Sequence, residues 1–166
     1  FEDFSKEVIT RGWSEKKLKK AEKREEKGKE APQLYNYKMR ETITLSDSSV
    51  VGIMERYYVQ IVSYSDPRSG SMSTTYTYFY DDLIAYRIEK NGVFDWVKKI
   101  PKMQYSSNDY GYLSSISSFV KGDIMTIIFN DHIDNYNESG IYNGNDYEIN
   151  YRKNTNAIAM VEMNLT

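Results

Sequence analysis

The chain has 166 residues, 40% hydrophobic and 28% charged, a composition that fits one ordinary globular domain. Cysteine is absent and the formal net charge is −2, which excludes disulfides, thiolate metal sites and a global attraction to nucleic acid. No apolar run reaches the roughly 18 residues of a transmembrane helix, so none is predicted. The 16 tyrosines favour β-strands over helices.

The first segment, residues 1–33, differs from the rest of the chain. Residues 1–12 are short and mixed, and we assign a strand to them. Residues 14–30 form a charge run with too few apolar residues to bury a face, so they are either a solvated helix or a disordered connector. Glu15 and Lys19 are a favourable i,i+4 pair if the helix forms. The mixed signs of charge favour solvation over the binding of nucleic acid or lipid.

Residues 34–104 form a second segment in which apolar and polar residues alternate with a period of two. Residues 50–62 are apolar on both faces, which is typical of a central strand. Asn91-Gly92 is a strong hairpin signal, because both turn residues would take a positive φ. The strands expected in this segment are 35–45, 50–62, 75–80, 82–90 and 93–100, with a polar loop at 64–74.

Residues 105–166 form a third segment, again with a β pattern. The loops expected are 104–115 and 134–146, and the strands expected are 116–129, 147–152 and 157–163.

An internal repeat links the second and third segments. Residues 52–61 resemble 123–132, and residues 82–89 resemble 156–163 at a similar spacing. Repeated groups of short strands are typical of stacked sheets, so we expect an all-β fold of antiparallel, four-stranded, blade-like sheets, a partial β-propeller. The chain stops where the second blade needs its last strand. Two blades cannot close a ring of about four to eight. We therefore expect a protein partner, or the remainder of a longer chain, to cover the open sheet edge.

The string YFYDDLIAYRIEKNGVFDWVKKIPKMQ (78–104) carries a DD-strand-NG-x-x-x-W-x-x-x-IPK-Q pattern. It resembles blades of exported β-propeller-like proteins of Gram-negative bacteria, and SDSSVVGIMERYYVQ (46–60) and SSFVKGDIMTIIFND (117–131) resemble other segments of them. One departure is Asp47-Ser48-Ser49, where an Asp-Gly turn is more usual. The resemblance implies export to the periplasm or cell surface and a scaffold or binding role, without known catalytic residues.

Three tyrosines in the expected 104–115 loop are candidates for partner binding. Tyr105, Tyr110 and Tyr112 combine a flat apolar ring with a polar tip, which suits a protein interface or stacking on sugars. Most other tyrosines fit ordinary β cores.

Other chemistry has weaker support in the sequence. A calcium-loop candidate places oxygen ligands at Asn135, Asn137, Ser139 and Asp146, but its first and last positions depart from the usual Asp and Glu. The single histidine, His132, is better explained as stabilising a turn than as a metal ligand. Glu55 lies in an apolar strand, where we favour a structural role over that of an acid or nucleophile, because glycoside hydrolysis needs a second carboxylate at a defined distance and the sequence indicates none.

These observations favour a non-catalytic protein-interaction or scaffold subunit of a bacterial cell-envelope complex, with no cofactor and no nucleic-acid partner. The alternative is a carbohydrate-binding module that uses the tyrosine-rich loops.

Overall fold

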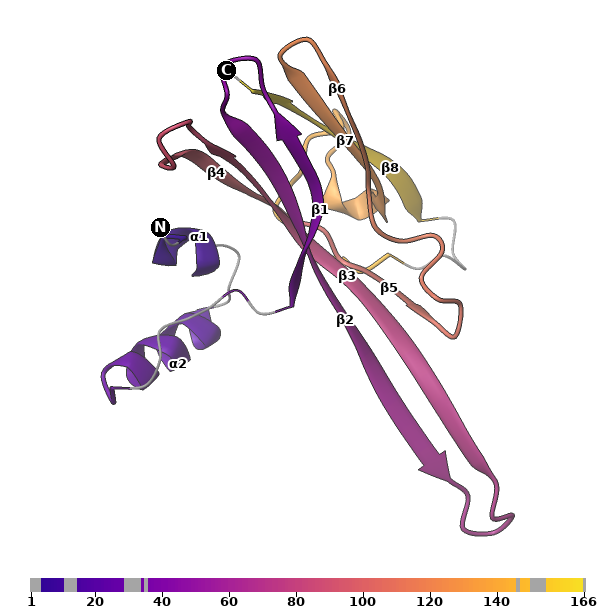
Figure 1. Cartoon of the computed structure of the whole chain (residues 1–166). Coiled ribbons are helices and arrows are strands. Elements are labelled where there is room, and N and C mark those ends of the chain that lie inside the picture. The colour runs from indigo at the N-terminus through magenta and orange to yellow at the C-terminus, as the bar shows by residue number, and fades with distance from the viewer. Residues whose placement is uncertain are drawn as a thin grey trace. The chain divides into compact units, whose positions relative to one another are not determined.

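The computed structural model describes residues 4–10, 15–28, 34, 36–145, 147–149 and 155–165. Strands make up 53% and helices 12%, and the sheets are antiparallel, which confirms the all-β prediction. The arrangement as propeller blades stays a prediction. None of the helices in the described part is long and apolar enough to cross a membrane. In chain order (Figure 1) the elements are α1 (Lys6–Thr10), α2 (Glu15–Glu25), β1 (Tyr37–Thr44), β2 (Val50–Ser65), β3 (Met72–Ile88), β4 (Phe94–Ile100), β5 (Gln104–Ser107), β6 (Ser117–Lys121), β7 (Ile124–His132), a 3-10 turn (Ile133–Asn135) and β8 (Asn156–Asn164).

Residues 6–10 are helical, so the strand predicted within residues 1–12 is wrong there, and residues 1–3, 11 and 12 lie outside the described part. Ser5 explains the difference, because its side chain accepts a hydrogen bond from the Val8 N–H (3.4 Å), as at a helix N-terminus. The charge run forms α2, which decides between the helix and the disordered connector, and the predicted Glu15–Lys19 pair is present at 3.7 Å. The Lys6 ammonium of α1 lies 2.6 Å from the Glu25 carboxylate of α2.

The larger sheet has the order β1-β2-β3-β4, and β5 pairs with β3. β2 lies between β1 and β3, as its apolar pattern predicted. β2 runs three residues past the expected end at 62, and β3 is one strand of 17 residues where two strands, 75–80 and 82–90, were predicted. A short turn after Ser65 joins β2 to β3. The loop predicted at 64–74 is therefore wrong at both ends, where residues 64–65 and 72–74 are strand, and right at 66–71, which form the turn. Its serines and threonines do not alternate with apolar residues, which hid the strands from a periodicity argument.

The predicted hairpin at Asn91-Gly92 is present, with Glu89 N–H donating to the Val93 carbonyl (2.9 Å) and Gly92 N–H to the Glu89 carbonyl (2.8 Å). Only Gly92 takes a positive φ (87°), so the expectation for Asn91 is wrong. The Asn91 side chain instead accepts a hydrogen bond from the Val93 N–H (3.0 Å). The turn is therefore stabilised by a side-chain amide and a single left-handed residue.

The smaller sheet has the order β6-β7-β8. The single strand predicted at 116–129 is wrong, because the chain reverses at Gly122-Asp123 and pairs Lys121 with Ile124. Gly122 has φ 61°, and glycine at the first of two central residues is typical of a tight hairpin. β8 confirms the strand expected at 157–163, and β7 is its one neighbour among the described strands.

The segment predicted as a strand at 147–152 is not one within residues 147–149, and residues 150–152 lie outside the described part. The Ile149 N–H donates to the Met103 carbonyl (3.2 Å), and both backbone groups of Tyr147 bond to the side chain of Asn135. At Tyr147, the side-chain amide of Asn135 thus makes the backbone hydrogen bonds that a neighbouring strand would otherwise make.

The chain divides into two compact units: residues 1–54 with 83–101, and residues 55–82 with 102–166. β2 and β3 contribute to both units, whereas the predicted segments are contiguous. The buried apolar residues of the first unit are Val51, Ile53, Leu83, Ile84, Ala85, Tyr86 and Ile100. Those of the second unit are Met125, Ile127, Phe129, Ile149, Ala159, Met163 and Leu165.

The repeated segments fall on β2 with β3 and on β7 with β8, and each pair consists of neighbouring strands. A shared strand order is also found in ordinary antiparallel meanders. The repeat and the partial propeller therefore stay predictions.

Candidate recognition surface

The carboxylate of Glu55 in β2 lies inside the second unit as half of an ion pair. The Lys102 ammonium is 2.7 Å from Glu55 Oε1, and both side chains are 0% exposed. The Ser115 hydroxyl donates a hydrogen bond to Glu55 Oε2 (2.7 Å). Buried ion pairs are tolerated where further hydrogen bonds satisfy both partners. The Glu55 carboxylate is therefore held in a buried ion pair that is closed to solvent.

Lys102 and Gln104 extend this ion pair into a buried network. The Lys102 ammonium also donates to the Tyr80 carbonyl (2.7 Å) and to Gln104 Oε1 (2.9 Å). Gln104 Nε2 donates to the Asn130 carbonyl (2.7 Å). The network thus joins β3, β5 and β7 within the second unit.

The same network holds one end of residues 108–115, which we call the tyrosine loop. The Ser115 backbone N–H donates to Gln104 Oε1 (2.7 Å), and Asn130 Nδ2 donates to the Leu113 carbonyl (2.9 Å). Ser115 has φ 78°, a left-handed conformation that costs a non-glycine residue about 1–2 kcal/mol. Hydrogen bonds to both its backbone and its hydroxyl offset that cost.

The other end of the tyrosine loop is held on β3. Asn108 N–H donates to the Tyr76 carbonyl, and the Tyr76 N–H donates to Asn108 Oδ1, both at 2.9 Å. Asn108 and Tyr110 have φ values of 58° and 60°. A left-handed tyrosine is a strained residue, and such strain persists where the surrounding structure imposes it, often at binding sites. The loop is therefore preorganised by contacts at both ends.

The tyrosine loop exposes two aromatic rings to solvent. Tyr110 is 72% exposed and Tyr112 is 81% exposed, and their ring centroids are 6.0 Å apart. Tyr110 also lies 6.2 Å from the ring of Tyr78 on β3. Gly111 packs against the Tyr80 ring, where a Cβ would come within 2.6 Å. The structure thus brings two predicted candidates, Tyr110 and Tyr112, together.

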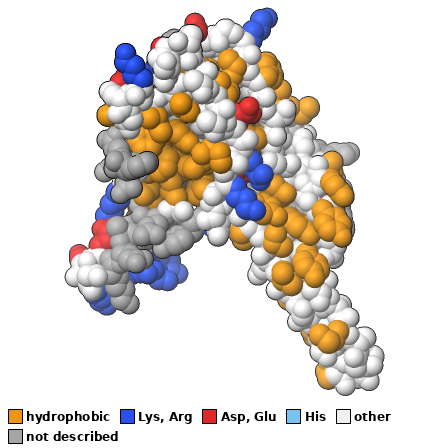
Figure 2. All heavy atoms as spheres, viewed as in Figure 1, with side chains coloured by type: hydrophobic (Ala, Val, Ile, Leu, Met, Phe, Trp, Pro, Cys, Tyr) orange, Lys and Arg blue, Asp and Glu red, His pale blue; other side chains and the backbone are white. Residues whose placement is uncertain are grey.

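Beside the tyrosine loop, β2 and β3 continue as a two-stranded ribbon, residues 59–65 and 72–76, which we call the β2–β3 ribbon (Figure 1). All of these residues are exposed, so both faces of the ribbon meet solvent. Hydrophobic side chains are visible along it in Figure 2. Its large exposed apolar residues are Val59, Ile61, Val62, Tyr64, Met72 and Tyr76.

Cross-strand contacts fix which ribbon residues share a face. Tyr57 lies 4.8 Å from Tyr80 between ring centroids, and the hydroxyls of Ser63 and Thr74 are 3.0 Å apart. The same register places Val59 opposite Tyr78 and Ile61 opposite Tyr76. These four side chains therefore share the face on which Tyr110 contacts Tyr78. Together with Tyr110 and Tyr112 they form what we call the recognition surface.

Tyr105 lies on the opposite face of the sheet from this surface. The loop predicted at 104–115 is wrong at its start, because residues 104–107 form β5 and pair Tyr105 with Phe79. Tyr58, Phe79 and Tyr105 stack in a row, with interplanar angles of 8° and 28°. Rings that stack on one another present their edges outward and stabilise the sheet. Tyr105 thus does not join Tyr110 and Tyr112.

The side-chain oxygens of two members of the calcium-loop candidate, Asn135 and Asn137, accept hydrogen bonds from the protein itself. Asn137 Oδ1 accepts hydrogen bonds from the N–H groups of Ser139 (3.0 Å) and Ile141 (2.9 Å), which makes a local turn. Asn135 is buried and its Oδ1 accepts from the Tyr147 N–H (2.7 Å). Asp146 lies outside the described residues. Within the described part, no group of three or more His, Cys, Asp or Glu side chains could hold a metal ion.

Asp131 is the centre of a polar cluster at the end of β7, which also contains Asn135 and Tyr136. Its carboxylate accepts hydrogen bonds from Asn135 Nδ2 (2.8 Å) and from the Tyr136 hydroxyl (2.7 Å). Desolvation, followed by the bond to Asp131, raises the pKa of Tyr136. His132 Nδ1 accepts from the Asp134 N–H (3.2 Å), so the prediction that His132 stabilises a turn is confirmed. The cluster fixes the chain after β7.

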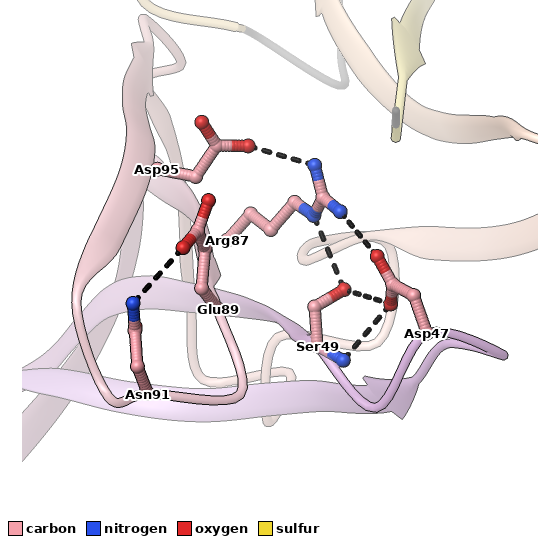
Figure 3. Close-up of polar contacts among 6 residues, drawn as sticks. All are labelled: Asp47, Ser49, Arg87, Glu89, Asn91 and Asp95. Carbon is pink, nitrogen blue, oxygen red and sulfur yellow. Dashed lines mark hydrogen bonds and ion pairs between the residues drawn. The ribbon is translucent and has the colours of Figure 1, made fainter.

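In the first unit, Arg87 forms the centre of a charged cluster (Figure 3). Its guanidinium bonds to Asp47 (2.6 Å) and Asp95 (2.7 Å), and its Nε donates to the Ser49 hydroxyl (3.1 Å). Hydrogen bonds from Ser49, followed by Arg87, lower the pKa of Asp47 to about 2. Two carboxylates around one guanidinium leave no positive charge for an anionic ligand. The cluster ties the β1–β2 turn to β3 and β4.

Asp81 on β3 is a buried carboxylate with a perturbed acidity. Desolvation raises its pKa to about 6, against the opposing effect of the Arg56 guanidinium 3.6 Å away. Burial thus exceeds the effect of the ion pair. The acidity of this group is relevant to stability, because it titrates near neutral pH.

Sequence reasoning missed the supporting residues of the recognition surface. Lys102 and Gln104 belong to the IPK-Q pattern, and their spacing in a motif was the available signal that they have a fixed role. Ser115 and the ribbon have no such signal. Comparisons with protein families, curated proteins and solved structures find no match to this chain.

Proposed function

We propose that this chain is a protein-interaction module that binds its partner through the recognition surface. The observation that carries the proposal is the β2–β3 ribbon, which exposes both faces while holding large apolar side chains. A two-stranded ribbon is marginally stable alone in water and needs packing on a face. Contiguous exposed apolar surface is typical of sites that bind another protein.

The tyrosine loop supplies the second part of the argument. Tyrosines combine large contact area with a hydroxyl that tolerates solvent, and they are enriched among the residues that dominate binding energy. Tyr110 and Tyr112 are held ready by the buried Glu55–Lys102–Ser115 contacts, so little conformational entropy is lost on binding. A preorganised pair of exposed rings beside an apolar ribbon fits a protein partner.

The cellular setting of the proposal comes from the resemblance to exported bacterial proteins. We place the module in a complex of the cell envelope, in the periplasm or at the cell surface, as a scaffold or accessory subunit without catalytic activity. Fractionation of the native cells tests this part separately. Recovery in the cytoplasm would contradict it.

Site-specific photo-crosslinking in the native cells tests the interaction. A photoreactive residue at Ile61 or Tyr112 is expected to capture the same polypeptide, and one at Phe119, another exposed aromatic site in β6, is expected to capture none. The purified pair should then bind at least tenfold more weakly after Tyr112→Ala, as expected of a central aromatic contact. If all three positions captured many unrelated proteins to the same extent, the proposal would be refuted.

Carbohydrate binding is the second candidate, and the exposed ring pair of Tyr110 and Tyr112 favours it. Aromatic rings with accessible faces suit the apolar faces of sugars. A glycan array followed by calorimetry should show binding that Tyr110→Ala and Tyr112→Ala abolish. Tyr147→Ala, at an exposed tyrosine outside the surface, is the control and should change nothing. Absence of binding to every glycan would remove this candidate.

A further inference from the structure

The outer edge of β2 between Val59 and Ser65 is not paired by the described strands. β2 has β1 and β3 as its neighbours. β1 has 8 residues against 16 in β2, and the short turn at 45–49 joins the two, so β1 reaches only the first half of β2. An exposed strand edge is a template for another strand, since only an extended backbone matches its alternating donors and acceptors.

The hydrogen bonds at the two ends of β2 tell which residues face outward. The Asp66 N–H donates to the Ser71 carbonyl (2.9 Å), so the even-numbered residues of β2 bond to β3. The Leu45 N–H donates to the Ser49 carbonyl (2.9 Å), which places β1 on the odd-numbered side. The backbone groups that point to the open edge belong to Val59, Ile61, Ser63 and Ser65.

We propose that two copies of this chain pair through these edges, antiparallel, around a twofold axis at Val62. The proposal rests on the proposed function of the ribbon as a protein contact and names a second copy as an occupant of its edge. Val59 of each copy then pairs with Ser65 of the other, and Ile61 with Ser63. All four outward residues are used, in about eight backbone hydrogen bonds.

The charge of the ribbon favours a second copy. The only charged residues between Val59 and Tyr76 are Asp66 and Arg68, both in the turn. Strand edges that avoid self-association usually carry lysine, proline or inward charges, and this edge has none. Near a twofold axis, each residue lies close to the same residue of the second copy, so a charged residue there would face a like charge. An uncharged strand has no such repulsion.

The pairing has a functional consequence. The twofold axis of an antiparallel pair is perpendicular to the sheet, so both copies present the face with Ile61 and Tyr76 on the same side. The dimer thus holds two recognition surfaces that face one way. When a partner with two matching sites has bound one surface, its second site meets the other surface at a high effective concentration. Its overall affinity therefore rises without any new kind of contact.

Light scattering on the eluting protein tests the pairing. At about 100 µM the wild-type chain is expected to have twice its mass of 19.5 kDa. Val62→Lys places two like charges at the axis and should weaken the dimer at least tenfold, with partial recovery in high salt. Met160→Lys, at an equally exposed site on β8, is the matched control and should leave the dimer intact.

Ile61→Pro is the second variant, because it removes an outward N–H without removing a hydrogen bond of the β2–β3 hairpin. It should also yield a monomer with wild-type circular dichroism. Amide exchange gives an independent readout: dimerisation should protect Ile61 and Ser63 N–H groups, whereas Val62 is protected in both states.

A wild-type monomer, or a Val62→Lys variant that dimerises like wild type, would overturn the pairing of copies. A monomer that still binds a crosslinked partner through Tyr112 would leave the proposed function standing. A dimer whose crosslinks lead only to its own second copy would support the pairing and remove the envelope partner.

Discussion

Ser48 in the β1–β2 turn occupies a position that suits glycine. Leu45 N–H donates to the Ser49 carbonyl and Ser48 N–H to the Leu45 carbonyl, the same pattern as in the turn that contains Gly92. Ser48 has φ 68° where Gly92 has 87°. A side chain in this conformation costs about 1 kcal/mol relative to glycine.

Ser48→Gly should therefore raise the free energy of unfolding, by less than about 1 kcal/mol, because the strain that glycine relieves is partly offset by the backbone entropy that it loses on folding. Urea denaturation measures the change. Ser46→Gly is the control, because Ser46 has no positive φ, and it should destabilise slightly. A loss of stability in Ser48→Gly would contradict the argument.

Asp81 predicts a pH dependence of stability. Its pKa of about 6 in the folded chain exceeds the ordinary value of 3.8, so the folded state binds a proton more tightly between these values. The stabilising effect of protonation is complete below about pH 4 and is lost as the pH rises through 6. Relative to Asp81→Asn, the wild-type free energy of unfolding should fall by roughly 2 kcal/mol from pH 4 to 7.

Asp47→Asn provides a control of opposite sign. The pKa of Asp47 is lowered to about 2, so its contribution is present above pH 3.8 and is lost as the pH falls through 2. Denaturant titrations of all three proteins across pH 2 to 7 measure both effects. A flat difference between wild type and Asp81→Asn would show that the folded-state pKa of Asp81 is ordinary.

At the scale of elements, the Glu55–Lys102 pair joins β2 to the residues before β5. Lys102→Met leaves the Glu55 carboxylate buried without its cation, and the expected cost is about 3–5 kcal/mol. The double variant Glu55→Leu with Lys102→Met removes both charges and should be more stable than Lys102→Met alone. Denaturation of both single variants and the double variant gives the coupling energy.

Ser115→Ala separates the tyrosine loop from this pair. It removes the hydrogen bond to Glu55 and should cost about 1–2 kcal/mol while speeding amide exchange in residues 108–115. Ser117→Ala, at an exposed serine at the start of β6, is the control and should leave exchange in residues 108–115 unchanged. For the Glu55–Lys102 pair itself, a loss of unfolding free energy in the double variant equal to the sum of the two single losses would show that the two groups are not coupled.

At the scale of the whole chain, the low net charge and the uncharged ribbon act together on solubility. The sequence isoelectric point is about 5.6, where repulsion between molecules is weakest. Turbidity should therefore be greatest near that pH. Tyr64→Lys on the ribbon should reduce it more than Asn156→Lys on β8, although both add one positive charge. Equal effects would mean that net charge alone decides solubility.

Local pattern was sufficient for the strand-rich fold, the hairpin at Asn91-Gly92 and the turn role of His132, because each depends on neighbours in the sequence. The sequence also contains the Gly-Asp turn signal at residues 122–123, which divides the single strand predicted at 116–129. The long ribbon escaped because serine and threonine show no hydrophobic period. The apolar strand around Glu55 indicates its burial, but Lys102 is 47 residues away in the sequence, and no local pattern pairs the two.

The sequence by itself determined that the chain is β-rich, cysteine-free and nearly neutral, since these follow from composition and short-range periodicity. Only the tertiary structure decided that Tyr110 and Tyr112 lie beside the ribbon while Tyr105 stacks on the other face. Only it decided that Glu55, Lys102 and Ser115 meet. Those outcomes depend on strand register and on contacts between residues distant in the chain, and a shift of one residue in register exchanges the two faces of a sheet.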